Sequence, residues 1–109
     1  MKTFTIYLFR HGITKGNINA QYIGRTDYPL TMDSISQLKS IKAKYHYPQV
    51  EAVFTSPLKR CTESADIMFP KNNPIVINDF VEYSFGEFEE RTAKELENNE
   101  DFTNWLRGD

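Results

Sequence analysis

Apolar residues recur along the chain with two different periods, which predict strands and helices. Residues 4–9 are six consecutive apolar or β-favouring residues, a pattern typical of a strand buried on both faces in the middle of a parallel sheet. Residues 50–55 and 75–77 predict two further strands. Apolar residues recur at helical spacing in residues 32–45 and 58–68. Together these segments predict an α/β fold with an open, mostly parallel sheet flanked by helices.

The segments between these elements are predicted to be loops and short helices. Thr14 is expected to cap a short helix within residues 13–20, and Thr31 is expected to cap the long helix that follows it. Glycine, aspartate and proline make residues 21–31 a loop. Residues 80–90 mix aromatic side chains with four carboxylates, which predicts an irregular, partly buried loop.

Composition places the chain among ordinary globular proteins. It has 109 residues, of which 39% are hydrophobic, so we expect one domain or part of one. The net charge of −2 provides no overall basic field for nucleic acid. The single cysteine, Cys61, excludes an intramolecular disulfide and favours a reducing compartment. The first apolar run is too short for a signal peptide or a membrane span, so we expect a cytoplasmic protein that does not associate with membranes.

The first predicted strand runs directly into Arg10-His11-Gly12. In open α/β sheets, ligands bind at the carboxyl ends of the strands, so these residues lie where a site is expected. Arginine offers a planar set of donors that suits phosphate, and histidine can act as a nucleophile or an acid/base near neutral pH. The alternative interpretation is an ordinary polar turn at the end of a strand.

Three further residues are candidates for the same site. Arg60 is expected in the first turn of a helix, where the helix dipole disfavours a cation unless an anion lies nearby. Asn17 could donate to a phosphate oxygen, although taken alone it is better interpreted as a polar residue on a helix surface. Glu82 lies close to the end of the third strand in a loop that could desolvate a carboxyl and raise its pKa.

These motifs, taken in order, resemble those of the histidine phosphatase superfamily, which is also called phosphoglycerate-mutase-like. The resemblance spans nearly the whole chain and rests on four motifs: Arg10-His11-Gly12, the loop from Gly24 to Thr31, Arg60 after Ser56-Pro57-Leu58, and Glu82 before Phe85-Gly86. It implies a phosphoglycerate-mutase-like sheet and phosphoryl transfer through a phosphohistidine.

The resemblance also implies a role for each candidate residue. His11 would attack phosphorus, and Glu82 would protonate the leaving oxygen and later deprotonate a water molecule. The phosphate would be bound by four residues, namely Arg10, Asn17, Gly24 and Arg60. This chemistry calls for a small phosphorylated substrate and for no metal or other cofactor, because phosphoryl transfer depends chiefly on positioning and positive charge.

The chain departs from the family pattern in two places. Family members carry a second histidine, in a His-Gly pair of the C-terminal half, and the only other histidine here is His46. The missing half would also supply a strand between the one ending at Arg10 and the one ending at Thr55, which leaves a gap in the sheet. We therefore expect residues 1–109 to be the N-terminal portion of a single, truncated histidine phosphatase domain. Glu90 stands where the family often has glycine.

Three functions fit this pattern. The acidic segment after Glu82 favours the phosphatase branch, which includes α-ribazole phosphatase-like members, acting on small phosphorylated metabolites. A phosphoglycerate mutase would use the same histidine chemistry but return the phosphoryl group to a second hydroxyl. A non-catalytic phosphate-binding fragment is the third possibility. Reading the motifs as turns alone leaves Arg60 and Glu82 unexplained.

Overall fold

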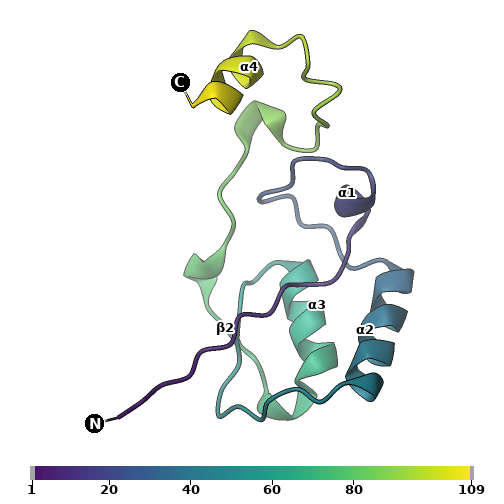
Figure 1. The fold of residues 1–109 in the computed structure, drawn as a ribbon, viewed down its shortest axis with the longest axis vertical. Coiled ribbons are helices and arrows are strands. Elements are labelled where there is room, and N and C mark those ends of the chain that lie inside the picture. Colours follow the sequence, from purple (N-terminus) through teal and green to yellow (C-terminus); the bar gives the residue numbers. More distant parts are fainter. Residues whose placement is uncertain (1, 109) are drawn as a thin grey trace.

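The computed structural model describes residues 2–108 and has an α/β architecture with a small parallel sheet (Figure 1). Over these residues the helices and strands follow in the order α1 (Lys15–Ile18), α2 (Met32–Lys44), β1 (Phe54–Thr55), α3 (Lys59–Met68), β2 (Ile75–Val76) and α4 (Glu100–Arg107). Short 3₁₀ turns cover Pro70–Asn72, Asn78–Phe80 and Gly86–Phe88. The predicted α/β fold class is confirmed.

Helices α2 and α3 pack against each other and form the main core. The Thr31 hydroxyl accepts a hydrogen bond of 3.1 Å from the Ser34 amide, so the predicted cap of α2 is confirmed. The buried residues of the core are Leu30, Leu38 and Met68. Several other apolar residues of the predicted helix 32–45 remain exposed, including Met32 at 84%, because α2 meets only one neighbouring layer.

Strands β1 and β2 are parallel and are connected through α3. Phe54 pairs with Ile75 and Thr55 pairs with Val76. Both strands are shorter than the predicted segments 50–55 and 75–77. A strand extends only as far as its neighbour pairs with it, and the apolar pattern alone does not set that length.

The predicted buried strand over residues 4–9 is wrong for this chain. The segment is extended but pairs with no strand among the described residues, and it lies largely in solvent (Figure 1). Ile6 is 82% exposed and Leu8 is 96% exposed. The apolar pattern is that of a central strand, but its neighbours are not present in residues 2–108. The gap in the sheet that the family resemblance implies stays a prediction.

An aromatic cluster joins the C-terminal part of the chain to the loop around residue 22. Tyr22 stands 5.5 Å from Phe85, 5.7 Å from Phe102 and 5.6 Å from Trp105, measured between ring centroids. These contacts hold α4 and the loop of residues 80–90 beside the loop of residues 21–31. Aromatic pairs at such spacings stabilise a packing arrangement by about 1 kcal/mol each.

The described chain is elongated (Figure 1). Its radius of gyration is 16.8 Å, whereas a compact domain of this length has a radius of about 13 Å. None of the helices in residues 2–108 combines the length and the apolar character that a membrane span requires.

Candidate active site

His11 lies in a turn that is anchored to α3. The Gly12 amide donates a 2.9 Å hydrogen bond to the buried hydroxyl of Ser64, and that hydroxyl donates to the Arg60 carbonyl at 2.6 Å. Gly12 also packs so closely on Leu30 and Leu38 that a Cβ here would lie 3.0 Å from each of their side chains. The backbone beside the imidazole is therefore fixed by both a hydrogen bond and packing.

The contacts of the His11 ring determine its protonation. Nδ1 lies 2.5 Å from the Gly12 carbonyl oxygen. Because a carbonyl can only accept, Nδ1 carries the proton and the lone pair of the neutral ring is on Nε2. Burial is the largest influence on the His11 pKa and lowers it from its ordinary value of 6.5, although the bond to Gly12 opposes this effect. A neutral ring with a basic Nε2 is the form that a nucleophile requires.

Three charged residues that the sequence singled out are brought near this ring. The positive charges of Arg60 and Arg10 lower the His11 pKa further, and the negative charge of Glu82 raises it. The Arg10 and Glu82 side chains are exposed, whereas Arg60 is only 4% exposed. His11 thus has the cation of Arg10 beside it in the chain, a buried cation from α3 and a carboxylate from the loop of residues 80–90.

Arg60 is held by backbone carbonyls of the preceding loop. Its guanidinium donates to Thr26 O at 2.9 Å and to Gly24 O at 2.7 Å. These carbonyls account for a buried cation near the start of α3 without requiring a bound anion. A guanidinium has five N–H donors, so these two bonds leave others for a ligand.

Gly24 lies where two loops approach closely. Its amide donates to Glu89, its carbonyl accepts from Arg60, and a Cβ on it would lie 2.0 Å from the Tyr83 carbonyl oxygen. Only glycine fits such an approach. The contacts explain why glycine is present, while phosphate binding by Gly24 stays a prediction.

Asn17 belongs to the cap of α1. Its side-chain oxygen accepts from the Thr14 amide at 2.9 Å and from the Thr14 hydroxyl at 3.2 Å. The predicted short helix with Thr14 at its start is confirmed. Asn17 is exposed, and its contribution to phosphate binding stays a prediction.

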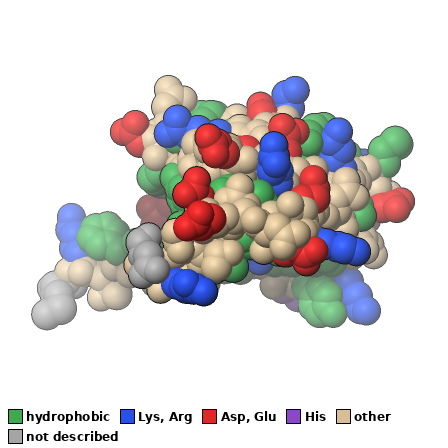
Figure 2. Space-filling model, turned by 90° about the horizontal axis from the view of Figure 1, so that it is seen from above, with side chains coloured by type: hydrophobic (Ala, Val, Ile, Leu, Met, Phe, Trp, Pro, Cys, Tyr) green, Lys and Arg blue, Asp and Glu red, His purple; other side chains and the backbone are tan. Residues whose placement is uncertain are grey.

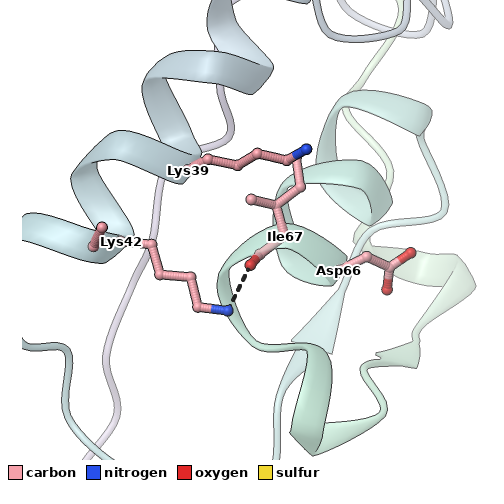
Figure 3. Close-up of a pocket in the computed structure, with 5 residues that line it drawn as sticks. Lys39, Lys42, Asp66 and Ile67 are labelled. Atoms are coloured by element: carbon pink, nitrogen blue, oxygen red, sulfur yellow. Dashed lines mark hydrogen bonds between the residues drawn. The ribbon is translucent and has the colours of Figure 1, made fainter.

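A small cavity of about 130 Å³ opens beside His11, between the end of segment 4–9 and β1. Cys61 also lines it; burial raises the pKa of this thiol, which favours its neutral form. A larger depression of about 590 Å³ lies between α2 and α3, away from the candidate residues (Figure 3). There the Lys42 ammonium donates to the Ile67 carbonyl at 3.0 Å.

The surface charge is mixed. Figure 2 shows acidic and basic side chains interspersed over the upper face of the molecule. With a net charge of −2, anion binding depends on the local placement of Arg10 and Arg60.

Two residues of the site region are not singled out by the sequence. Ser64 falls beside the apolar face of α3, and its bond to Gly12 spans 52 residues, so no local pattern indicates it. Glu89 is one of four carboxylates in a short segment, and only the fold distinguishes it by placing it against the loop of residues 24–26.

The sequence pattern of the histidine phosphatase superfamily (branch 1) matches residues 6–109. The chain belongs to this family and has its phosphoglycerate-mutase-like α/β fold.

Curated relatives and solved structures agree with this assignment. The chain is 30% identical over 104 residues to the adenosylcobalamin/alpha-ribazole phosphatase of Escherichia coli, covering 92% of this chain and 51% of the relative. It is 32% identical over 93 residues to a probable phosphoglycerate mutase of Serratia proteamaculans, covering 84% of this chain and 43% of that protein. The crystal structure of Entamoeba histolytica phosphoserine phosphatase with 3-phosphoglyceric acid superposes with a TM-score of 0.73 at 27% identity, covering 91% of this chain and 50% of that one. The chain spans about half the length of the relatives it matches.

Proposed function

We propose that this chain carries the nucleophilic half of a phosphomonoester hydrolase that works through a phosphohistidine at His11. One observation supports the proposal most directly. The Nδ1 proton of His11 is engaged by the Gly12 carbonyl, so the unprotonated Nε2 is available beside the two cations Arg10 and Arg60. A neutral imidazole beside positive charge suits attack on a phosphate ester.

In the first step, His11 Nε2 forms a bond to phosphorus and the bond from phosphorus to the ester oxygen breaks. Arg10 and the remaining donors of Arg60 bind the equatorial oxygens, with Asn17 assisting. Glu82 acts as the general acid and supplies the proton that the leaving oxygen takes up. The products of this step are the free alcohol, the phosphohistidine and the Glu82 carboxylate.

In the second step, the Glu82 carboxylate takes a proton from a water molecule, whose oxygen attacks phosphorus. The bond between phosphorus and Nε2 breaks, and inorganic phosphate leaves. His11 and Glu82 return to their starting protonation states, so the cycle is balanced without a metal or another cofactor.

The substrate class we propose is a small phosphorylated metabolite. The alpha-ribazole and phosphoserine phosphatases among the related proteins support hydrolysis. The similarity to a probable phosphoglycerate mutase supports the alternative, in which the phosphoryl group returns to a second hydroxyl. A mutase requires priming by a bisphosphate and a hydrolase does not, so substrate conversion with and without such a primer separates the two.

We further propose that residues 1–109 form the N-terminal portion of one phosphatase domain, and that the second histidine of the family pocket comes from a longer polypeptide. A small metabolite as substrate and a single cysteine favour a cytoplasmic location. A 109-residue chain that binds phosphate but does not hydrolyse phosphate esters would fit the third possibility, a non-catalytic fragment.

Hydrolysis of p-nitrophenyl phosphate in the presence of a chelator tests the proposal. The protein is assayed as its organism makes it, beside the 109-residue chain, each with a His11→Ala variant. We expect metal-independent hydrolysis that His11→Ala lowers by at least about a thousandfold, since a nucleophile is removed. A matched His46→Ala variant should keep wild-type activity. Activity retained in His11→Ala would contradict the assignment.

A further inference from the structure

The Glu89 carboxylate is surrounded by donors from two loops. Its Oε1 accepts from the amides of Gly24, Arg25 and Phe85 at 2.7, 3.2 and 3.1 Å. Its Oε2 accepts from the amide and the hydroxyl of Thr26 at 3.3 and 2.5 Å. Partial burial alone would raise the Glu89 pKa, but these hydrogen bonds together outweigh that effect and lower the pKa from its ordinary value of 4.5. Glu89 is therefore a carboxylate near neutral pH.

The opposite side of the same loop meets a cation. Glu89 binds the amides of residues 24–26, and Arg60 binds the carbonyls of Gly24 and Thr26. The peptide groups of this loop thus lie between a carboxylate and a guanidinium. Charge-assisted hydrogen bonds on both sides fix the loop more firmly than neutral contacts would. A shift of the loop would move the carbonyls that orient Arg60.

The loop also contacts the backbone of the proposed acid. Arg25 Nε donates to the Glu82 carbonyl at 3.1 Å, and Gly24 packs against the Tyr83 carbonyl. Residues 24–26 therefore connect the segment that carries Glu82 with the guanidinium of Arg60. Both groups act electrostatically on His11.

We propose that Glu89 is a positioning residue of the phosphate site: by binding the amides of residues 24–26, it holds the carbonyls that orient Arg60 and the side chain that contacts Glu82. This inference rests on the proposed function, because it assigns Arg60 to the phosphate. Among the described residues, the hydrogen bonds of the Glu89 carboxylate go to residues 24–26 and to Phe85, and none goes to His11. Its effect reaches the site through the loop.

The variant Glu89→Gln replaces one acceptor oxygen with an NH₂ group that faces donors. We expect the dissociation constant for inorganic phosphate, measured by calorimetry, to rise about tenfold, the equivalent of one charge-assisted hydrogen bond. Thr26→Val, which removes one donor, should weaken phosphate binding in the same direction and to a smaller extent. Thr26→Ser, which keeps the hydroxyl donor, should bind phosphate with wild-type affinity. Glu87→Gln is the matched control, since Glu87 is an exposed carboxylate of the same loop.

A second readout separates positioning from general stability. The His11 titration is followed by proton NMR, and its signal is identified by its absence from the spectrum of the His11→Ala variant. If Arg60 moves away, Glu89→Gln raises the His11 pKa, because a nearby positive charge lowers it in the wild type. A role confined to stability would lower the unfolding temperature and leave this titration unchanged.

Wild-type phosphate affinity together with an unchanged His11 titration in Glu89→Gln would overturn the inference. If Glu89→Gln does not fold, the same two measurements on Thr26→Val decide it. Neither measurement requires turnover. Failure of this inference is therefore distinct from failure of the proposed function, which the His11→Ala assay reports.

Discussion

At the scale of single residues, backbone contacts decide what the candidate side chains can do. The sequence predicts His11 as a nucleophile, but the tautomer that supports this role depends on the Gly12 carbonyl, 2.5 Å from Nδ1. The sequence predicts that Arg60 is a cation that binds an anion. In the structure its guanidinium donates instead to the carbonyls of Thr26 and Gly24. Residue type and spacing identify candidates, whereas long-range contacts such as those of Glu89 follow only from the fold.

Glu90 has a backbone conformation that is unfavourable for a residue with a side chain. Its φ is +65°, a left-handed conformation that favours glycine. This conformation explains why glycine suits the position and why the sequence singled out Glu90 as a departure. In compensation, its carboxylate accepts from the Tyr28 hydroxyl at 2.6 Å.

We expect Glu90→Gly to be more stable than Glu90→Ala by about 1 kcal/mol, because both variants lose the carboxylate but only alanine retains the left-handed strain. Urea denaturation measures the difference. At Glu87, which is not among the residues with positive φ, the order should reverse. Equal stabilities of the two Glu90 variants would show that the conformation stores no strain.

At the scale of elements, α3 provides the two buried polar residues that fix the loops of the site. It supplies Arg60, and it supplies Ser64, which is 2% exposed and links the His11 turn to the helix. The sequence predicts this helix well, because apolar spacing and helix length are local properties. It predicts strands less well, because β1 and β2 extend only where each pairs with the other.

Ser64→Ala should destabilise the fold by about 1–3 kcal/mol, since the Gly12 amide loses its buried partner. Thermal or urea unfolding measures this effect. Ser40→Ala on the exposed face of α2 is the control and should be neutral or slightly stabilising, because alanine has the higher helix propensity. A neutral Ser64→Ala would mean that the His11 turn does not depend on α3.

At the scale of the whole molecule, the described residues form a small two-stranded sheet, and the segment 4–9 lies outside it. The radius of gyration of 16.8 Å reflects the extended segment 4–9 and the peripheral position of α4. The sequence predicts both the strand-like pattern of this segment and the gap beside it. It does not predict that the segment lies in solvent, because burial depends on neighbours that residues 2–108 do not contain.

Such a segment presents unpaired backbone groups and apolar side chains, which favour association between chains. We expect the 109-residue chain to self-associate with rising concentration in sedimentation experiments. The double variant Ile6→Ser, Leu8→Ser should reduce association. Met32→Ser, which removes a single exposed apolar side chain from α2, should not. A wild-type chain that stays monomeric throughout would refute this expectation.

The central claim is that His11 carries the phosphoryl group during turnover. The most direct measurement is rapid acid-free quenching of the protein, as its organism makes it, with a phosphomonoester, followed by mass spectrometry of the peptide containing His11. We predict a phosphoryl group on His11 that is stable in base, is released by acid and is absent in His11→Ala. A phosphoryl group on another residue, or hydrolysis with no phosphorylated peptide at any time point, would contradict the account.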